Sequence, residues 1–182
     1  MSPRLVTPVN DADHVAGSAA APITLVEYGD FECPHCGRAH PVLQHVQERM
    51  GQELRLVFRH FPLRESHPHA EHAAEATESA GEQGEFWAMH DQLFEHQDAL
   101  EDEDLIGYAA DIGLDPDAVA EDLGAGTFQS RVQDDFMDGV RSGVNGTPTF
   151  FVNGHRYDGD WEDPAAFERA LRGMAGRSRS NA

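Results

Sequence analysis

The stretch that decides the fold is residues 23–36, ITLVEYGDFECPHC, where an apolar run is followed by the only two cysteines of the chain. The β-branched and apolar residues at positions 23–28 predict a strand. Apolar residues then recur at helical spacing as far as position 50, which predicts a helix over residues 34–50. Cys33 and Cys36 therefore lie where a strand is followed by a helix. Two thiols at this spacing and in this place indicate a redox-active pair.

The helix start predicts different roles for the two cysteines. Unpaired backbone N–H groups and the positive end of the helix dipole stabilise a thiolate at Cys33. Pro34 suits the first helical position, where no N–H is needed, and leaves Cys33 as the exposed end of the motif. Cys36, one turn into the helix, is expected to be the shielded thiol that resolves a mixed disulfide. Asp30 and Glu32 are expected to be exposed loop acids whose charge opposes the thiolate.

Two structural roles are alternatives for the cysteine pair. A disulfide within CxxC closes so short a loop that it restrains the unfolded chain little. A structural zinc site needs two further ligands, which would have to come from the 11 histidines because no other cysteine is present. Three of these lie close together near a predicted helix start, His67, His69 and His72, and we interpret them as surface or capping residues. We expect neither a metal nor another cofactor.

Composition limits the class of protein. A chain of 182 residues with 40% hydrophobic content can form one substantial core, and no apolar run approaches the roughly 18 residues of a membrane span. The chain has 33 acidic residues and 13 basic ones, all of them arginine, and its formal net charge is −20. Such a surface repels nucleic acids and anionic membranes, so we expect neither as a partner. It is interpreted as a solvated acidic face, with adaptation to high salt as the alternative.

The first residues bear on localisation. Residues 1–6 lack the apolar core of a signal peptide, and residues 10–21 read as a polar lead-in. As it stands the sequence predicts a cytoplasmic protein, although dithiols in that compartment are normally held reduced. A periplasmic or other extracytoplasmic location is the alternative if a leader has been removed.

The remaining pattern divides into a helical middle and a return of strand signals. Residues 53–61 alternate as a second strand, and residues 68–143 are helical, with Gly and Pro interruptions that indicate four or five helices. Strands are expected at 149–152 and 156–158, joined by an Asn-Gly turn. A last helix is expected over residues 164–174, with a frayed end from residue 177.

This order, βαβ, a helical block and then ββα, predicts an α/β fold in which two halves of one sheet are separated by an inserted helical subdomain. The expected organisation is an N-terminal lead-in (1–13), the first half of the core (14–63), the inserted subdomain (64–143), the second half of the core (144–175) and a flexible tail (176–182).

The two motifs together resemble a known family. The Cys-Pro-His-Cys segment, the helical insertion and GTPTFFVNG at residues 146–154 are similar to the DsbA family of thioredoxin-fold thiol-disulfide oxidoreductases. The resemblance covers about residues 14–175. It is closest to the bacterial thioredoxin-like DsbA branch, which shows segments similar to HFPL at 60–63 and FWAMH at 86–90. It implies a thioredoxin-like fold and disulfide exchange with protein substrates.

The resemblance also implies roles for individual residues. Cys33 corresponds to the nucleophilic cysteine and Cys36 to the resolving one. Pro148 matches the cis-proline of the family, which packs against the disulfide, whereas from the residues alone a trans turn proline is the simpler reading. The backbone at Thr147, next to Gly146, corresponds to the place where an extended substrate pairs as an added strand.

Three further positions concern proton transfer and oxidising strength. Glu27 corresponds to a buried acid that moves protons to and from Cys36, and an edge-facing carboxylate is the alternative. The dipeptide Pro34-His35 is that of strongly oxidising members, because a histidine beside the thiolate stabilises the reduced form. Thr147, in contrast, resembles the reductase and isomerase branches. The direction of electron flow therefore stays open.

The sequence thus predicts a thiol-disulfide oxidoreductase that needs no cofactor. Its expected partners are cysteine-containing protein substrates and an electron donor or acceptor, and the chain is expected to be a monomer without membrane insertion. Two alternatives are a redox-sensing or binding module that uses the pair as a switch, and a glutathione-dependent transferase or isomerase on the same fold.

Overall fold

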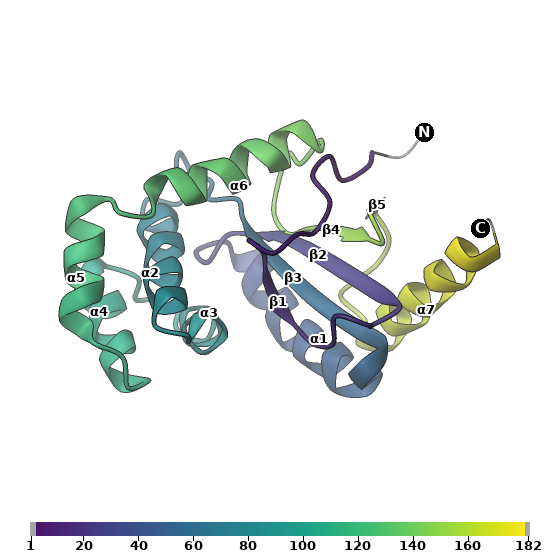
Figure 1. Ribbon diagram of the computed structural model, residues 1–182, viewed down its shortest axis with the longest axis horizontal. Coiled ribbons are helices and arrows are strands. Elements are labelled where there is room, and N and C mark those ends of the chain that lie inside the picture. Colours follow the sequence, from purple (N-terminus) through teal and green to yellow (C-terminus); the bar gives the residue numbers. More distant parts are fainter. Residues whose placement is uncertain (1–2, 181–182) are drawn as a thin grey trace.

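The computed structural model describes residues 3–180, with the side chains of residues 3–175. At the centre of this part of the chain is a mixed five-stranded sheet with the order β1-β3-β2-β4-β5 (Figure 1). Its strands are β1 (His14–Ala16), β2 (Ile23–Gly29), β3 (Leu54–His60), β4 (Thr149–Val152) and β5 (His155–Tyr157). Strands β2 and β3 are parallel, whereas β4 runs antiparallel to β2. Segments from both ends of the chain therefore form one sheet.

Helices cover both faces of the sheet and extend it sideways (Figure 1). Helix α1 (Pro34–Met50) and helix α7 (Pro164–Ser180) lie on one face, and α6 (Gln129–Arg141) lies across the other. The remaining helices form a block beside the sheet, α2 (Ala70–Glu82), α3 (Phe86–Glu95), α4 (Asp102–Asp111) and α5 (Pro116–Ala125), and a short 3-10 helix, Gly51–Glu53, follows α1. The predicted α/β, thioredoxin-like order with an inserted helical segment is confirmed.

Alternation along the central strand β2 separates two cores. Ile23 and Leu25 face α1 and α7, whereas Val26 and Tyr28 face α6. Glu27 follows the parity of Ile23 and Leu25, so that it points toward the α1 side. A third apolar cluster fills the helical block and includes both cysteines. The cysteine pair thus lies where the block meets the sheet.

Two boundaries differ from the predictions. Residues 10–21, predicted to be a polar lead-in, contain β1, which pairs antiparallel with the outer edge of β3. Three residues are too few for alternation to reveal a strand. Helix α7 continues to Ser180 instead of ending at Met174, so much of the predicted tail is helical, and residues 181–182 lie outside the described residues.

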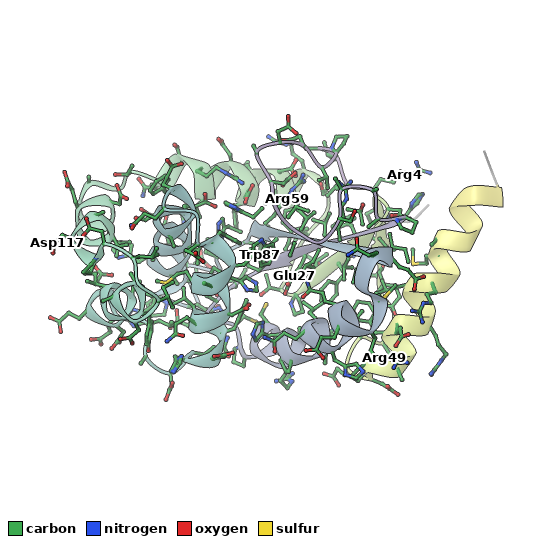
Figure 2. All side chains as sticks on the ribbon, turned by 60° about the horizontal axis from the view of Figure 1, so that its bottom comes forward. Arg4, Glu27, Arg49, Arg59, Trp87 and Asp117 are labelled. Atoms are coloured by element: carbon green, nitrogen blue, oxygen red, sulfur yellow. The ribbon has the colours of Figure 1, made fainter. Side chains whose placement is uncertain are left out.

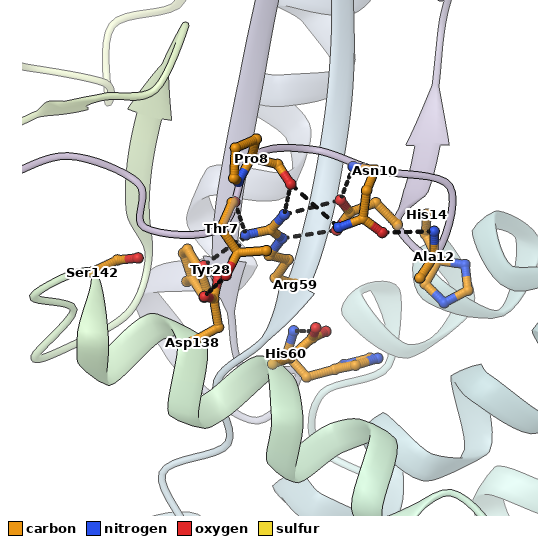
Figure 3. Close-up of polar contacts among 12 residues, drawn as sticks. Thr7, Pro8, Asn10, Ala12, His14, Tyr28, Arg59, His60, Asp138 and Ser142 are labelled. Carbon is orange, nitrogen blue, oxygen red and sulfur yellow. Dashed lines mark hydrogen bonds and ion pairs between the residues drawn. The ribbon is translucent and has the colours of Figure 1, made fainter.

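A buried arginine joins the N-terminal segment to the sheet and to α6 (Figure 3). Arg59 on β3 donates to Asp13 at 2.8 and 2.9 Å, to Asp138 at 2.7 Å and to the Tyr28 hydroxyl at 3.1 Å. It also donates to the carbonyl oxygen of Thr7 at 3.0 Å. Arg59 is only 2% exposed, and its buried charge is tolerated because it is paired with carboxylates and hydrogen-bonded.

None of the helices in the described residues combines the length and the apolar character that a bilayer crossing requires.

Candidate redox active site

Both cysteines are buried beneath the turn that precedes β4. Cys33 directly precedes α1 and is 3% exposed, and Cys36 in the first turn of α1 is 0% exposed. The prediction that Cys33 is the exposed end of the motif is therefore wrong. The turn covers it, because its Sγ donates to the carbonyl oxygen of Thr147 at 3.5 Å. The two cysteines are free thiols here.

The surroundings of the two thiols shift their pKa values in opposite directions. Hydrogen bonding to Cys36 is the largest cause that lowers the pKa of Cys33, to about 5, and it outweighs the burial that opposes ionisation. The backbone N–H groups of Cys36 and His35 lower it further. Burial raises the pKa of the Cys36 thiol, as do Cys33 and the charge of Glu27. At neutral pH the pair is a thiolate at Cys33 beside a neutral thiol at Cys36.

The covering turn comes from a distant part of the chain. Pairing of β4 with β2 places Thr149 opposite Tyr28 and so brings the residues before β4 to the start of α1. The Thr147–Pro148 peptide bond is cis. The Thr149 hydroxyl donates to the carbonyl oxygen of Gly146 at 2.7 Å and closes the turn. Gly146, Thr147 and Pro148, singled out from the sequence, thus lie together at the cysteine pair.

Glu27 is a buried acid in the middle of the molecule (Figure 2). It is 1% exposed on β2, which has β3 and β4 as neighbours, so it is not an edge-facing carboxylate. Its Oε2 atom finds no hydrogen-bond partner among the described residues. Burial, assisted by the charge of Cys33, raises the pKa of Glu27 to about 8. A carboxyl in this state can exchange a proton near neutral pH.

Asp30 and Glu32 are not exposed loop acids, and that prediction is wrong. Asp30 is 1% exposed, and its carboxylate accepts from the backbone N–H of Leu63 at 2.9 Å and pairs with Nδ1 of His67 at 2.7 Å. Glu32 is half-buried and accepts from the backbone N–H of His69 at 2.7 Å. Both acids are partnered because the segment after β3 folds back over the loop between β2 and α1.

His67 carries a charge that offsets Asp30. Burial lowers the pKa of His67, but the hydrogen bond and charge of Asp30 outweigh it, and the pKa is raised overall. The charge of Cys33 contributes in the same direction. Asp30 therefore favours the charged form of His67, and that positive charge would offset the acid beside Cys33.

His35 is placed differently from its expected position beside the thiolate. Its side chain is exposed, and its Nδ1 accepts from Nη2 of Arg38 at 2.6 Å. The contribution of His35 to the low pKa of Cys33 comes from its backbone N–H. Any residue type with a free backbone N–H at position 35 would lower the pKa of Cys33 in the same way, because the N–H belongs to the first turn of the helix.

Gln97, which follows α3, was not found from the sequence. Its Nε2 donates to the carbonyl oxygens of Phe31 at 2.7 Å and Cys33 at 2.9 Å, and so fixes the loop that carries Cys33. Gly37 makes room for it, because a Cβ there would lie 2.0 Å from Oε1 of Gln97. A single glutamine within a stretch predicted to be helical has no pattern that could reveal this contact.

A model of the thioredoxin family, described as "Thioredoxin", matches residues 9–172. The chain therefore belongs to this family, with a fold of the DsbA-like kind.

Three solved structures show that fold over almost the whole chain. Oxidised BdbD from Bacillus subtilis superposes with a TM-score of 0.84 at 24% identity and covers 96% of this chain and 97% of its own. A thioredoxin-like oxidoreductase from Silicibacter pomeroyi gives 0.80 at 26% identity, with 95% of each chain covered. The α-DsbA1 protein of Wolbachia pipientis gives 0.80 at 21% identity, with 97% of each covered. The resemblance to the DsbA family is confirmed at the level of fold.

Curated relatives of higher identity have different names. A protein of Salinispora arenicola named Na(+)/H(+) antiporter NhaA 1 is 46% identical over 173 residues, which are 94% of this chain and 26% of the relative. A protein of Mycobacterium sp. strain KMS with the same name is 47% identical over 92% of this chain and 28% of the relative. The chain spans about a quarter of the length of these relatives.

Proposed function

We propose that the protein is a thiol-disulfide oxidoreductase that exchanges disulfides with cysteines of protein substrates. The observation that carries the proposal is the opposite shift of the two thiols. The pKa of Cys33 is lowered to about 5 and that of Cys36 is raised. A thiolate is both the better attacking group and the better leaving group in disulfide exchange, so Cys33 is the sulfur that exchanges with substrate.

In the oxidising direction a substrate thiolate attacks Sγ of Cys33 in the Cys33–Cys36 disulfide. A substrate–Cys33 bond forms, the bond to Cys36 breaks, and Cys36 leaves with the electron pair and takes up a proton. A second substrate thiolate then attacks the substrate sulfur, which releases Cys33 as a thiolate. The substrate gains a disulfide, and the protein is left as the reduced dithiol. The reverse sequence reduces a substrate disulfide.

Glu27 supplies the proton in this proposal. Its buried carboxyl has a pKa raised to about 8, and it interacts electrostatically with both cysteines. It can therefore give a proton to Cys36 as that sulfur leaves and recover it in the reverse step.

The backbone around Thr147 forms the substrate-binding edge in this proposal. Its carbonyl lies beside Cys33 at the turn before β4, where an extended segment can add its own backbone hydrogen bonds. In this proposal residues 14–63 supply the cysteine pair, residues 144–175 supply this turn, and the helical block within residues 64–143 packs beside the cysteine pair.

Trapping of substrate tests the proposal. Cys36→Ser removes the resolving thiol, so mixed disulfides through Cys33 should accumulate with reducible protein substrates such as insulin. The matched control is the double variant Cys33→Ser with Cys36→Ser, which should form no adduct. Absence of dithiol-sensitive adducts in the single variant, together with no catalysis of insulin reduction or of oxidation of a reduced protein, would refute the proposal.

A redox-sensing module is the second candidate, and the curated relatives favour it. They are 46–47% identical to almost the whole chain, yet the chain spans only about a quarter of proteins named as antiporters. In such a setting the cysteine pair would act as a switch for a larger protein without turnover. Reversible oxidation of the pair with no catalysed exchange would identify this role.

A further inference from the structure

Two histidines and an aspartate meet at a small cavity between the sheet and the helical block. His40 lies on α1, one turn beyond Cys36, and His90 and Asp91 lie on α3. The cavity has a volume of about 110 Å³ and is lined by these three residues and by Ala16, Leu43, Gln44, Gln47, Leu56 and Trp87. One ligand atom from each of the three lies within 4.8 Å of the other two.

The ring nitrogens at this cavity lack partners. His40 is 6% exposed and His90 is 3% exposed, and the Nε2 atom of each finds no hydrogen-bond partner within the described part of the chain. Asp91 approaches both rings, with its Oδ1 at 2.8 Å from Nδ1 of His90 and 3.9 Å from Nε2 of His40. A buried nitrogen without a partner destabilises the folded state, so two of them at one cavity can gain stabilisation from a group bound there.

The other buried histidine cluster shows the contrast. His14 and His60 both place Nε2 on the same oxygen of Glu78, at 2.8 and 2.7 Å. Their Nε2 atoms are thus already engaged by a carboxylate, and the triad joins β1 and β3 to α2, although Nδ1 of His60 has no hydrogen-bond partner among the described residues. At the His40 cavity the Nε2 lone pairs are still available.

We propose that His40, His90 and Asp91 bind a divalent transition-metal cation, of which zinc is the expected one. Imidazole nitrogen and carboxylate oxygen are the donors that Zn²⁺ and Ni²⁺ accept in proteins. A cavity of about 110 Å³ has room for the ion and a water molecule that completes its coordination. The formal net charge of −20 favours a cation anywhere on this chain.

The titration of the ligands agrees with this geometry. Burial lowers the pKa of His40, and the neighbouring His90 lowers it further against Asp91 and Glu95. Burial lowers the pKa of His90 as well, assisted by His60 and His14 and opposed by Asp91. Both imidazoles are therefore neutral at pH 7, which is the form that donates a lone pair to a metal.

The test is a titration of the Cys33→Ser, Cys36→Ser variant of this chain, in which the thiols are removed as competing ligands. Calorimetry with Zn²⁺ should show one saturable site. His90→Gln, His40→Gln and Asp91→Asn should each weaken it at least about tenfold, since loss of an outer-shell partner already costs 10–100-fold. The matched controls are His60→Gln in the other cluster and His72→Gln on the surface, which should leave the affinity unchanged.

Trp87 provides a second readout. Its ring centroid lies 4.9 Å from that of His90, so paramagnetic Ni²⁺ should quench its fluorescence. Trp87→Phe should remove the quenching but keep the calorimetric binding. Asp91 is 46% exposed, so Asp91→Asn should fold even if the histidine variants do not, which circular dichroism checks. The proposal is overturned by absence of a saturable site, by binding that Asp91→Asn leaves unchanged, or by loss of binding in His60→Gln.

Discussion

Two buried polar regions, the Arg59 cluster and the cysteine pair with Glu27, solve the problem of burial in opposite ways. Arg59 meets two carboxylates, a hydroxyl and backbone carbonyls at hydrogen-bonding distance. At the redox site Glu27 keeps an oxygen without a partner among the described residues, and the two cysteines have pKa values displaced in opposite directions.

The difference separates stability from chemistry. A buried charge that is fully partnered fixes the surrounding segments and resists any change of protonation. A buried acid without a partner keeps its proton until the pH approaches neutral. A thiol whose sulfur accepts several hydrogen bonds ionises at a pH well below neutral. The first region therefore joins the N-terminal segment, the sheet and α6, whereas the second has the protonation states that the proposed function requires.

The largest expected effect is the difference in reactivity between the two cysteines. With a pKa near 5 for Cys33 and a raised pKa for Cys36, Cys33 should react with iodoacetamide at pH 7 at least about 100-fold faster. Mass spectrometry of peptides from the briefly labelled reduced protein measures the ratio. The labelling rate of Cys33 should fall about tenfold per pH unit below pH 5. Preferential labelling of Cys36 would reverse the proposed roles.

Glu27→Gln should change how stability depends on pH. The pKa of Glu27 is about 8 in the folded protein against an ordinary 4.5, so the folded state binds the proton more tightly between these values. Wild-type stability then falls as pH rises from about 4.5 to 8, by an amount on the order of 5 kcal/mol. The variant has no such group. Between pH 4.5 and 8 its free energy of unfolding should therefore rise relative to that of the reduced wild type by about the same amount.

Urea unfolding of both reduced proteins at pH 5 and pH 9 measures this gain, because titrating groups that do not interact with Glu27 cancel in the difference. Glu32→Gln is the control, since that carboxylate is half-buried and accepts from a backbone N–H. An identical pH dependence in wild type and Glu27→Gln would mean that the carboxyl is already ionised in the fold.

Arg59→Met should destabilise the protein by about 3–5 kcal/mol at pH 7, because it removes the close ion pairs of two buried carboxylates, Asp13 and Asp138, and leaves Asp138 only the longer ion-pair contact with Arg141 at 3.8 Å. The control on the same strand is Arg55→Met, whose guanidinium donates to the Thr24 hydroxyl and is half-buried. That change should cost less than about 1 kcal/mol. Equal losses of unfolding free energy in the two variants would show that the ion pairs of Arg59 do not stabilise the fold more than the half-buried contact of Arg55 does.

Local patterns predicted much of this arrangement and failed where distant segments meet. The strand before the cysteines and the helix after them follow from apolar patterns within a few residues, and the buried position of Glu27 is what the family resemblance implied. The burial of Asp30 does not, because its partners Leu63 and His67 are 33 and 37 positions away. Gln97 lies 66 positions from Phe31, whose carbonyl it binds. Such contacts depend on how loops fold over one another, and their residue types have no periodicity.

The smallest expected effect concerns His67. Its imidazolium balances Asp30, and the charge of Cys33 is among the causes that raise the pKa of His67, so the stabilisation between thiolate and imidazolium is mutual. His67→Gln can keep a hydrogen bond to Asp30 but removes the positive charge. The pKa of Cys33 should therefore rise by roughly half a unit to one unit.

The pH dependence of thiolate absorbance at 240 nm in Cys36→Ser proteins measures that shift. His72→Gln is the matched control, because the pKa of His72 is likewise raised by its hydrogen bond to an aspartate, Asp102, but Cys33 is not among the causes. The reduction potential should move downward in His67→Gln, since the reduced form loses stabilisation, and should stay unchanged in His72→Gln. If both variants shift the thiol equally, the effect comes from the net charge of the protein. The difference between the two therefore tests whether the acid beside the nucleophile is tolerated only because His67 pairs with it.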